Sequence, residues 1–254
     1  MDERVAVVTG GGSGIGAATA LLLAERGLTV AVVGRRAEKL QWVVSEIEAG
    51  GGAALAVPAD LADAAAPQAI VAAVLERTGR LDVLVNNAAS FWLRPFGEYS
   101  FEDIDAHLTV NIRAVLLLVQ AALPALRRSP APVVVNVSSA AAVMYRPGQA
   151  VYGLTKAALE HLTKQLAAEL APDRIRVNAV RPGPTDTPLH QAVADPNGRL
   201  EQLGRLTPLG RVGRPDEIAW WIAALIDPHA EWVTGAVIPV DGGRVLGPPE
   251  QPQP

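Results

Sequence analysis

The chain has 254 residues, of which 50% are hydrophobic and 19% charged, and its formal net charge is -4. These values predict one globular domain, exclude global disorder and argue against a nucleic-acid partner, which would need a clustered basic face. The absence of cysteine excludes a disulfide framework, a thiolate metal site and a cysteine nucleophile, and it suits a cytoplasmic protein.

Short runs rich in β-branched residues recur along the chain, and each is followed by a segment of helical period. The runs begin at Val5, Thr29, Ala53, Leu81, Val133, Arg174 and Ala236. They are apolar on both faces, as are the strands of a parallel sheet that helices cover on both sides. We therefore predict an α/β fold with a single doubly wound, Rossmann-like, seven-stranded parallel sheet, formed by one domain over residues 1–247.

Two predicted helices show the spacing of one buried face. Their apolar positions are Leu40, Val43, Val44 and Ile47 in the first helix, and Leu159, Leu162, Leu166 and Leu170 in the second. Ser100, with Asp103 three residues later, predicts the start of a long helix that runs toward Arg128. Its apolar stretch, 114–126, is shorter than the roughly 20 residues of a membrane span, so we expect a core helix and no membrane partner.

Three segments are expected to stand apart from the core. Residues from about 183 to 215 hold several prolines and glycines, which predicts a mobile excursion that covers the substrate. Residues 248–254 are proline-rich and are predicted to be disordered. The first ten residues, MDERVAVVTG, carry two acids where a signal peptide has a basic region, so export is not expected.

A glycine-rich segment, TGGGSGIG, follows the first predicted strand and leads directly into a helix. Glycine permits a tight turn and a close approach of the backbone, and the amides at a helix N-terminus favour a pyrophosphate. The candidate cofactor-binding residues in this turn are Gly10, Ser13, Gly14, Ile15 and Gly16. The spacing GxxxGxG differs from the commonest GxGxxG, and the alternative is a glycine-rich turn that binds nothing.

Tyr152 and Lys156 form a YxxxK segment in a predicted helix, and their i, i+4 spacing places both on one face. A free phenol with a pKa of about 10 is a poor acid or base at neutral pH. At ~4 Å and an effective dielectric constant of about 20, an ammonium stabilises the phenolate by at most about 4 kcal/mol, or about three pKa units, which would bring the phenol into the useful range. Ser139 lies thirteen residues upstream of Tyr152, just past the fifth strand. Alone, each residue is typical of an ordinary surface or partly buried position; together they predict a catalytic site.

Taken in their order, these motifs resemble those of the short-chain dehydrogenase/reductase family over residues 5–243, and the resemblance is to its 3-oxoacyl-carrier-protein reductase-like branch. It also includes NNAA at 86–89, where Ala89 departs from the usual glycine, and RPGPTDT at 181–187. The resemblance implies an oxidoreductase with a nicotinamide cofactor and a small-molecule carbonyl or alcohol substrate. It further implies a homotetramer that uses the helices around 101–128 and 150–171 and the last strand.

The resemblance implies a role for each of four catalytic residues. Tyr152 would donate or accept the proton, and Lys156 would lower the pKa of Tyr152 and hold the nicotinamide ribose. Ser139 would orient the substrate oxygen. Asn111, in the long helix, would hold a proton-relay water. Because hydride transfer to a carbonyl needs a proton on oxygen, this set implies a reaction between a carbonyl and a secondary alcohol.

The resemblance also assigns further residues to the cofactor. Asp60 and Leu61, after the third strand, would contact the adenine, and Asn87 belongs to the motif after the fourth strand. Thr187 would bind the carboxamide, and Thr185 would contribute backbone contacts.

The end of the second strand predicts which dinucleotide is bound. NAD-specific sheets of this type place an acid there for the ribose 2′-hydroxyl, but this chain has Gly34, followed by Arg35 and Arg36. An arginine offers a planar donor fork to a 2′-phosphate, so NADP(H) is preferred and NAD(H) remains possible. The alternatives are an NAD-linked alcohol or dihydrodiol dehydrogenase of the same family, or a non-catalytic dinucleotide-sensing regulator, which typically loses the tyrosine or lysine.

Histidines and aromatic residues complete the candidates. The four histidines, at 107, 161, 190 and 229, lack a paired metal spacing, so no metal site is predicted and core or surface roles are favoured. Among them, His190 is placed where it could touch substrate. Phe91 and Trp92 are expected at the pocket rim, and Trp220 and Trp221 in the core or at a subunit contact.

Overall fold

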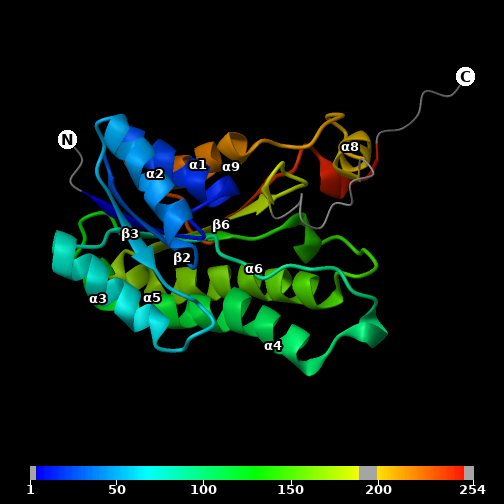
Figure 1. The fold of residues 1–254 in the computed structure, drawn as a ribbon, viewed down its shortest axis with the longest axis horizontal. Helices are drawn as coiled ribbons and strands as arrows, with labels where there is room; N and C mark the ends of the chain where they lie inside the picture. The colour runs from blue at the N-terminus through cyan, green and yellow to red at the C-terminus, as the bar shows by residue number, and fades with distance from the viewer. Residues whose placement is uncertain (1–3, 189–198, 249–254) are drawn as a thin grey trace, which may run out of the picture.

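The computed structural model describes residues 4–188 and 199–248, and its centre is a seven-stranded parallel sheet (Figure 1). The strand order is β3-β2-β1-β4-β5-β6-β7. The bounds are β1 (Val5–Thr9), β2 (Thr29–Gly34), β3 (Ala54–Pro58), β4 (Val83–Asn86), β5 (Val133–Val137), β6 (Arg176–Pro182) and β7 (Val237–Val240). The predicted doubly wound sheet is confirmed, and the valine-rich central strands are almost completely buried, as its covered faces require.

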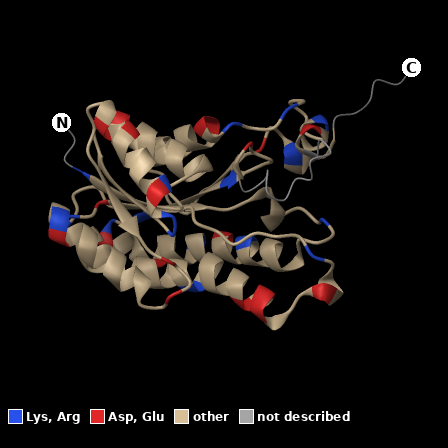
Figure 2. Ribbon diagram, in the orientation of Figure 1, with Lys and Arg blue, Asp and Glu red and all other residues tan. Residues whose placement is uncertain are grey.

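Helices cover both faces of the sheet, one layer above and one below it in Figure 1. The first layer contains α1 (Gly14–Glu25), α2 (Ala37–Ala49) and α9 (Pro215–Ile226); the second contains α3 (Ala66–Thr78), α5 (Ala114–Leu126) and α6 (Ala150–Leu170). Each layer packs on its own buried cluster, in which α2 contributes all four predicted apolar positions. Lysine, arginine, aspartate and glutamate are interspersed over the elements in Figure 2.

The long helix predicted to start at Ser100 consists of α4 (Phe101–Leu108), one π-helical turn (Thr109–Arg113) and α5. Ser100 and Asp103 form a reciprocal capping box, with both hydrogen bonds at 3.1 Å, which confirms the predicted start.

By length and composition alone, the helix over 101–126 could cross a membrane, but 44% of its most apolar window is buried inside the protein. The same pattern is found in helices of a protein core.

The carboxyl ends of the strands place the candidate motifs at one edge of the sheet. Chain order reverses between β1 and its neighbour β4, and α/β sheets bind ligands at such a switch point. Thr9, at the end of β1, joins the two strands because its hydroxyl accepts hydrogen bonds from the amides of Asn87 and Ala88 at 2.9 and 3.0 Å. The glycine-rich turn and the NNAA turn are therefore held side by side.

The segment after β6 contains structure that its sequence did not predict. It includes a short helix, α8 (Arg199–Arg205), whereas residues 189–198, with His190, and the tail residues 249–254 lie outside the described residues. Trp220 and Trp221 are exposed on α9, at 51% and 40%, so the core is the wrong one of their two predicted places and a subunit contact stays a prediction.

Candidate active site

The turn after β1 has the backbone that a bound dinucleotide needs. Gly10 and Gly14 adopt positive φ angles of 64° and 54°, which side chains disfavour. No side chain caps the start of α1, and its first turn carries no acid. Because the first amides of a helix lack intrahelical partners and carry partial positive charge, this end suits a phosphate group. The residues present thus fit a dinucleotide at the predicted turn.

Gly16 is required for a different reason, because neighbouring atoms lie too close to it to leave room for a side chain. Asn87 Nδ2 donates to Thr9 O at 2.8 Å and lies against the turn. A Cβ atom on Gly16 would overlap the carbonyl of Gly10 and come within 2.6 Å of Asn87 Nδ2. Asn87 therefore holds the turn from the side of β4.

A cleft beside this turn brings together residues that are far apart in the sequence. It is lined by predicted site residues from five segments: Gly10, Ser13, Gly14, Ile15, Asn87, Ser139, Tyr152, Lys156, Thr185 and Thr187. Ala88, Ala89, Val137 and Pro182 also line it. Asn111 lies behind the cleft, and Arg35, Arg36, Asp60 and Leu61 lie outside this lining.

Tyr152 is buried on the first turns of α6, with 7% of its surface exposed. The ring of Phe91 packs against it with centroids 4.5 Å apart, although neither Phe91 nor Trp92, both predicted at the pocket rim, is among the residues that line the cleft. Burial raises the pKa of Tyr152 to about 12, because the phenolate loses solvation, while a hydrogen bond with Ser139 acts in the opposite direction. Tyr152 and Ser139 therefore meet, as the motif spacing predicts.

Lys156 lies on the same face of α6 but bonds to the sheet. Its ammonium donates to Val137 O at 2.8 Å and lies 5.7 Å from the centroid of the Tyr152 ring. Burial lowers the pKa of Lys156 to about 8, and the negative charge of Glu160 opposes this shift. The sequence predicts that the ammonium of Lys156 lowers the pKa of Tyr152 toward the neutral range. In the structure the ammonium is held by β5 and the phenol is desolvated, so the pKa of Tyr152 is raised instead.

Asn111 sits in the π-helical turn with 1% exposure, and its side chain is fully engaged. Its Nδ2 donates to Ser90 O and to Thr155 Oγ1, both at 3.0 Å, and its Oδ1 accepts from Ser90 N at 2.8 Å. The amide thus ties the loop after β4 to α6. Thr155, which sequence reasoning missed, lies between Tyr152 and Lys156 on that helix.

The adenosine end of the candidate site is formed by the ends of β2 and β3. Arg35 and Arg36 are exposed there, and no charged partner holds either side chain among the described residues. Gly34 pairs with Pro58, so the segments that carry these arginines and Asp60 leave the sheet from the ends of neighbouring strands. The start of α2 also approaches the turn, since a Cβ on Gly12 would lie 3.1 Å from that of Lys39.

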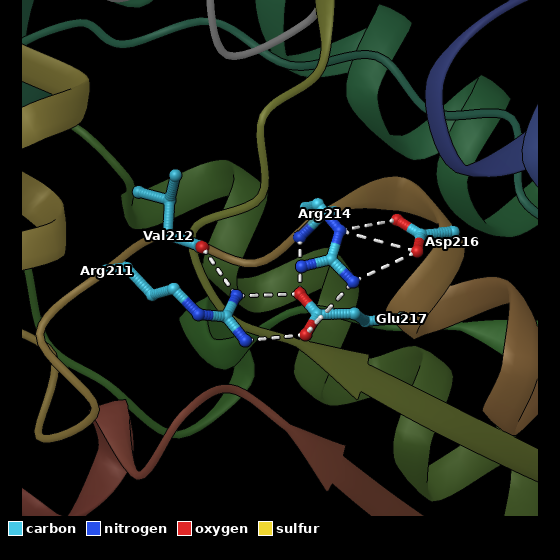
Figure 3. A network of polar contacts seen from close by, with 5 residues as sticks. All are labelled: Arg211, Val212, Arg214, Asp216 and Glu217. Atoms are coloured by element: carbon cyan, nitrogen blue, oxygen red, sulfur yellow. Dashed lines mark hydrogen bonds and ion pairs between the residues drawn. The ribbon is translucent and has the colours of Figure 1, made fainter.

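Thr185 and Thr187 are buried in the segment after β6, and a neighbouring loop braces that segment. Gly213 N donates to Pro184 O at 2.8 Å, and Asp186 N donates to Gly213 O at 2.9 Å. Figure 3 shows how this loop is anchored: Glu217, at the start of α9, accepts two hydrogen bonds from Arg211, at 2.8 and 2.6 Å. Because Arg211 and the amide of Arg214 bind this carboxylate, the pKa of Glu217 falls to about 2.

His107 is a core residue at the back of the cleft. It is 0% exposed, and its Nδ1 lies 2.7 Å from Asp103 O, so this nitrogen carries the proton. Its ring packs 4.4 Å from that of Trp92 and 6.4 Å from that of Tyr152. The favoured non-catalytic role of this histidine agrees with that position.

Comparisons with known proteins agree on one family. A family model described as enoyl-(acyl carrier protein) reductase matches residues 10–244. The chain is 37% identical to the 3-oxoacyl-[acyl-carrier-protein] reductase FabG of Thermotoga maritima over 97% of this chain and 99% of the relative. The chain belongs to the short-chain dehydrogenase/reductase family.

Two solved structures support this membership and bear on the cofactor. A short-chain dehydrogenase from Burkholderia cenocepacia in complex with NADP is 38% identical, with a TM-score of 0.88, over 95% of this chain and 97% of the other. A 3-ketoacyl-(acyl-carrier-protein) reductase from Brucella melitensis complexed with NADH is 36% identical, with a TM-score of 0.88, over 95% and 98%. This family member is therefore a nicotinamide-dependent oxidoreductase of the FabG-like branch.

Proposed function

We propose that this enzyme is an NADP(H)-linked reductase of carbonyl compounds that also runs in reverse on secondary alcohols. The observation that carries the proposal is the cleft beside the glycine-rich turn, where the buried Tyr152 and Lys156 lie together with the partly buried Ser139. When bound, the nicotinamide group supplies or accepts the hydride. Tyr152 delivers or removes the proton at its hydroxyl, and Ser139 orients the substrate oxygen beside it.

The other residues of the site bind and orient in this proposal. Lys156 places a positive charge near the Tyr152 ring and would hold the nicotinamide ribose, and Asn111 keeps the loop after β4 against α6. Thr187 approaches Gly14, where a Cβ would lie 3.1 Å from its methyl carbon, and from this position it would bind the carboxamide.

A turnover screen tests the proposal. Ketones, 3-oxoacyl thioesters and secondary alcohols are offered with NADPH, NADH, NADP and NAD, and cofactor binding is measured separately by fluorescence titration. Turnover of at least one carbonyl substrate is expected. Tight cofactor binding without turnover of any compound would favour the dinucleotide-sensing regulator, and the absence of both would contradict the proposal.

The cofactor preference is proposed from Arg35 and Arg36, which are free to bind a 2′-phosphate at the end of β2. We expect kcat/KM with NADPH to exceed that with NADH by about tenfold or more, equal to about 1.4 kcal/mol. The double variant Gly34→Asp with Arg35→Ala should abolish or reverse this preference. The new aspartate has room, because a Cβ on Gly34 meets only Leu40, at an ordinary 3.4 Å.

Arg77→Ala, a change in exposed positive charge at the end of α3, is the control for the cofactor experiment. It should leave the ratio of the two kcat/KM values unchanged. A parent enzyme that prefers NADH would instead support the second candidate, an NAD-linked alcohol dehydrogenase, which the NADH complex of the Brucella relative favours.

We also propose a cytoplasmic homotetramer. The helix over 101–126 and α6 expose large apolar side chains, including Phe101 at 77% and Leu154 at 61%, which a subunit interface would cover. Light scattering at micromolar concentration should give four times the chain mass of 26.6 kDa. A monomer would contradict the proposal, and Leu154→Glu should lower the mass if α6 lies in an interface.

A further inference from the structure

A buried ion pair lies directly behind the cleft and has no role in the proposed reaction. Arg181, on β6, donates from Nε and Nη2 to the two carboxylate oxygens of Glu160, at 2.7 and 2.6 Å. The two side chains are only 17% and 10% exposed. Burying two charges costs desolvation energy that their attraction only partly repays, so stability alone is a weak reason for this pair.

The pair is connected to Lys156 through both the helix and the sheet. Glu160 follows Lys156 by four residues on α6, so the two side chains leave the same face one turn apart. Ser138 Oγ donates to Glu160 Oε1 at 2.8 Å and lies 3.4 Å from Lys156 O. Val137, which holds the Lys156 ammonium, is the residue before Ser138.

Within the described part of the chain, Glu160 is the charged group that acts on Lys156. Tyr152 and Glu160 face it from α6, Arg181 reaches this layer from β6, and Asp241, just after β7, acts on Arg181. Burial lowers the pKa of Lys156 to about 8, and Glu160 is the group that raises it. Because burial disfavours the charged form of Lys156, the negative charge of Glu160 acts on the side of the protonated form.

We propose that the Glu160–Arg181 pair sets the pH range over which Lys156 stays protonated, with its two charges acting in opposite directions. Neither residue lines the cleft, so both are positioning residues that act through Lys156. The inference rests on the proposed function only for its consequence for catalysis. In the proposed function, a charged Lys156 supports the Tyr152 phenolate and the ribose. The charge effect itself can be measured without any substrate.

The sign of each effect follows from the charges that remain. Glu160→Gln removes the negative charge that favours protonation of Lys156 and leaves the cation of Arg181 uncompensated, so it lowers the pKa of Lys156. Arg181→Gln leaves the negative charge of the Glu160 carboxylate uncompensated. This charge favours protonation of Lys156 and therefore raises the pKa of Lys156. The double variant has the same local net charge as the parent, so its Lys156 pKa should return close to the parent value.

The test is an NMR titration of the lysine side chains in protein labelled with ¹³C at lysine Cε. The chain has three lysines, and Lys39 and Lys164 are exposed and serve as internal references. Lys39→Arg and Lys164→Arg identify their own signals and leave that of Lys156. We expect shifts of about one pH unit or more, down in Glu160→Gln and up in Arg181→Gln, each a tenfold change in the ionisation constant.

Asp173→Asn provides the matched control, because it breaks the exposed Arg127–Asp173 pair and should leave Lys156 unchanged. Shifts of the same sign in both single variants, or no shift in either, would overturn the proposal. If one single variant does not fold, the other single variant and the double variant still give the sign of the charge effect on the pKa of Lys156. Failure of the proposed function would appear instead as turnover retained by the Tyr152→Phe enzyme. The lysine titration does not depend on that result.

Discussion

Replacing Tyr152 with phenylalanine is expected to lower kcat/KM by roughly a thousandfold or more, within the range that a single general acid or base contributes. The change removes the hydroxyl that bonds to Ser139 and keeps the ring that packs against Phe91. Folding and cofactor affinity should therefore stay close to those of the parent. Steady-state kinetics, cofactor titration and thermal unfolding measure the three quantities separately.

Tyr99→Phe is the matched control for this experiment. It removes a hydroxyl of the same kind, which donates to Gly148 O at 3.0 Å and does not line the cleft. It should cost about 1 kcal/mol of stability, the usual net value of one hydrogen bond, with turnover retained. Tyr152→Phe activity within tenfold of the parent would refute the assigned proton transfer.

Gly16→Ala is expected to destabilise the protein by about 3 kcal/mol or more, which lowers the Tm of a domain of this size by about 6–12 °C. Gly16 lies in α1, where alanine is intrinsically favoured over glycine by about 1 kcal/mol. The close contacts with Gly10 and Asn87 reverse that sign, because both partners are held by hydrogen bonds and cannot withdraw. The same displacement should weaken NADPH binding.

Gly97→Ala is the control, since a Cβ there meets no atom within 4 Å. Its Tm and its NADPH affinity should equal those of the parent. A Gly16→Ala protein with an unchanged or higher Tm would show that the approach of Asn87 to the turn is not needed for the fold.

The fold could be predicted because its signals are local. Strands such as 133–137 are apolar on both faces, which only a sheet covered on both sides satisfies, and the Ser100 and Asp103 capping box needs only a spacing of three residues. The candidate site followed from motif order, since each motif comes after a strand whose carboxyl end lies at one edge of the sheet. The short helix α8 was missed because its segment has no long hydrophobic period.

The sequence by itself determined the fold class, the positions of the strands and the place of Tyr152 and Lys156 on one helical face. Only the tertiary structure decided that Lys156 bonds to Val137, that burial raises the pKa of Tyr152, and that Glu160 meets Arg181. The physical reason is that desolvation and hydrogen bonding depend on which atoms surround a group. Those atoms come from β5 and β6, whose distance from α6 is set when the sheet and its helices assemble.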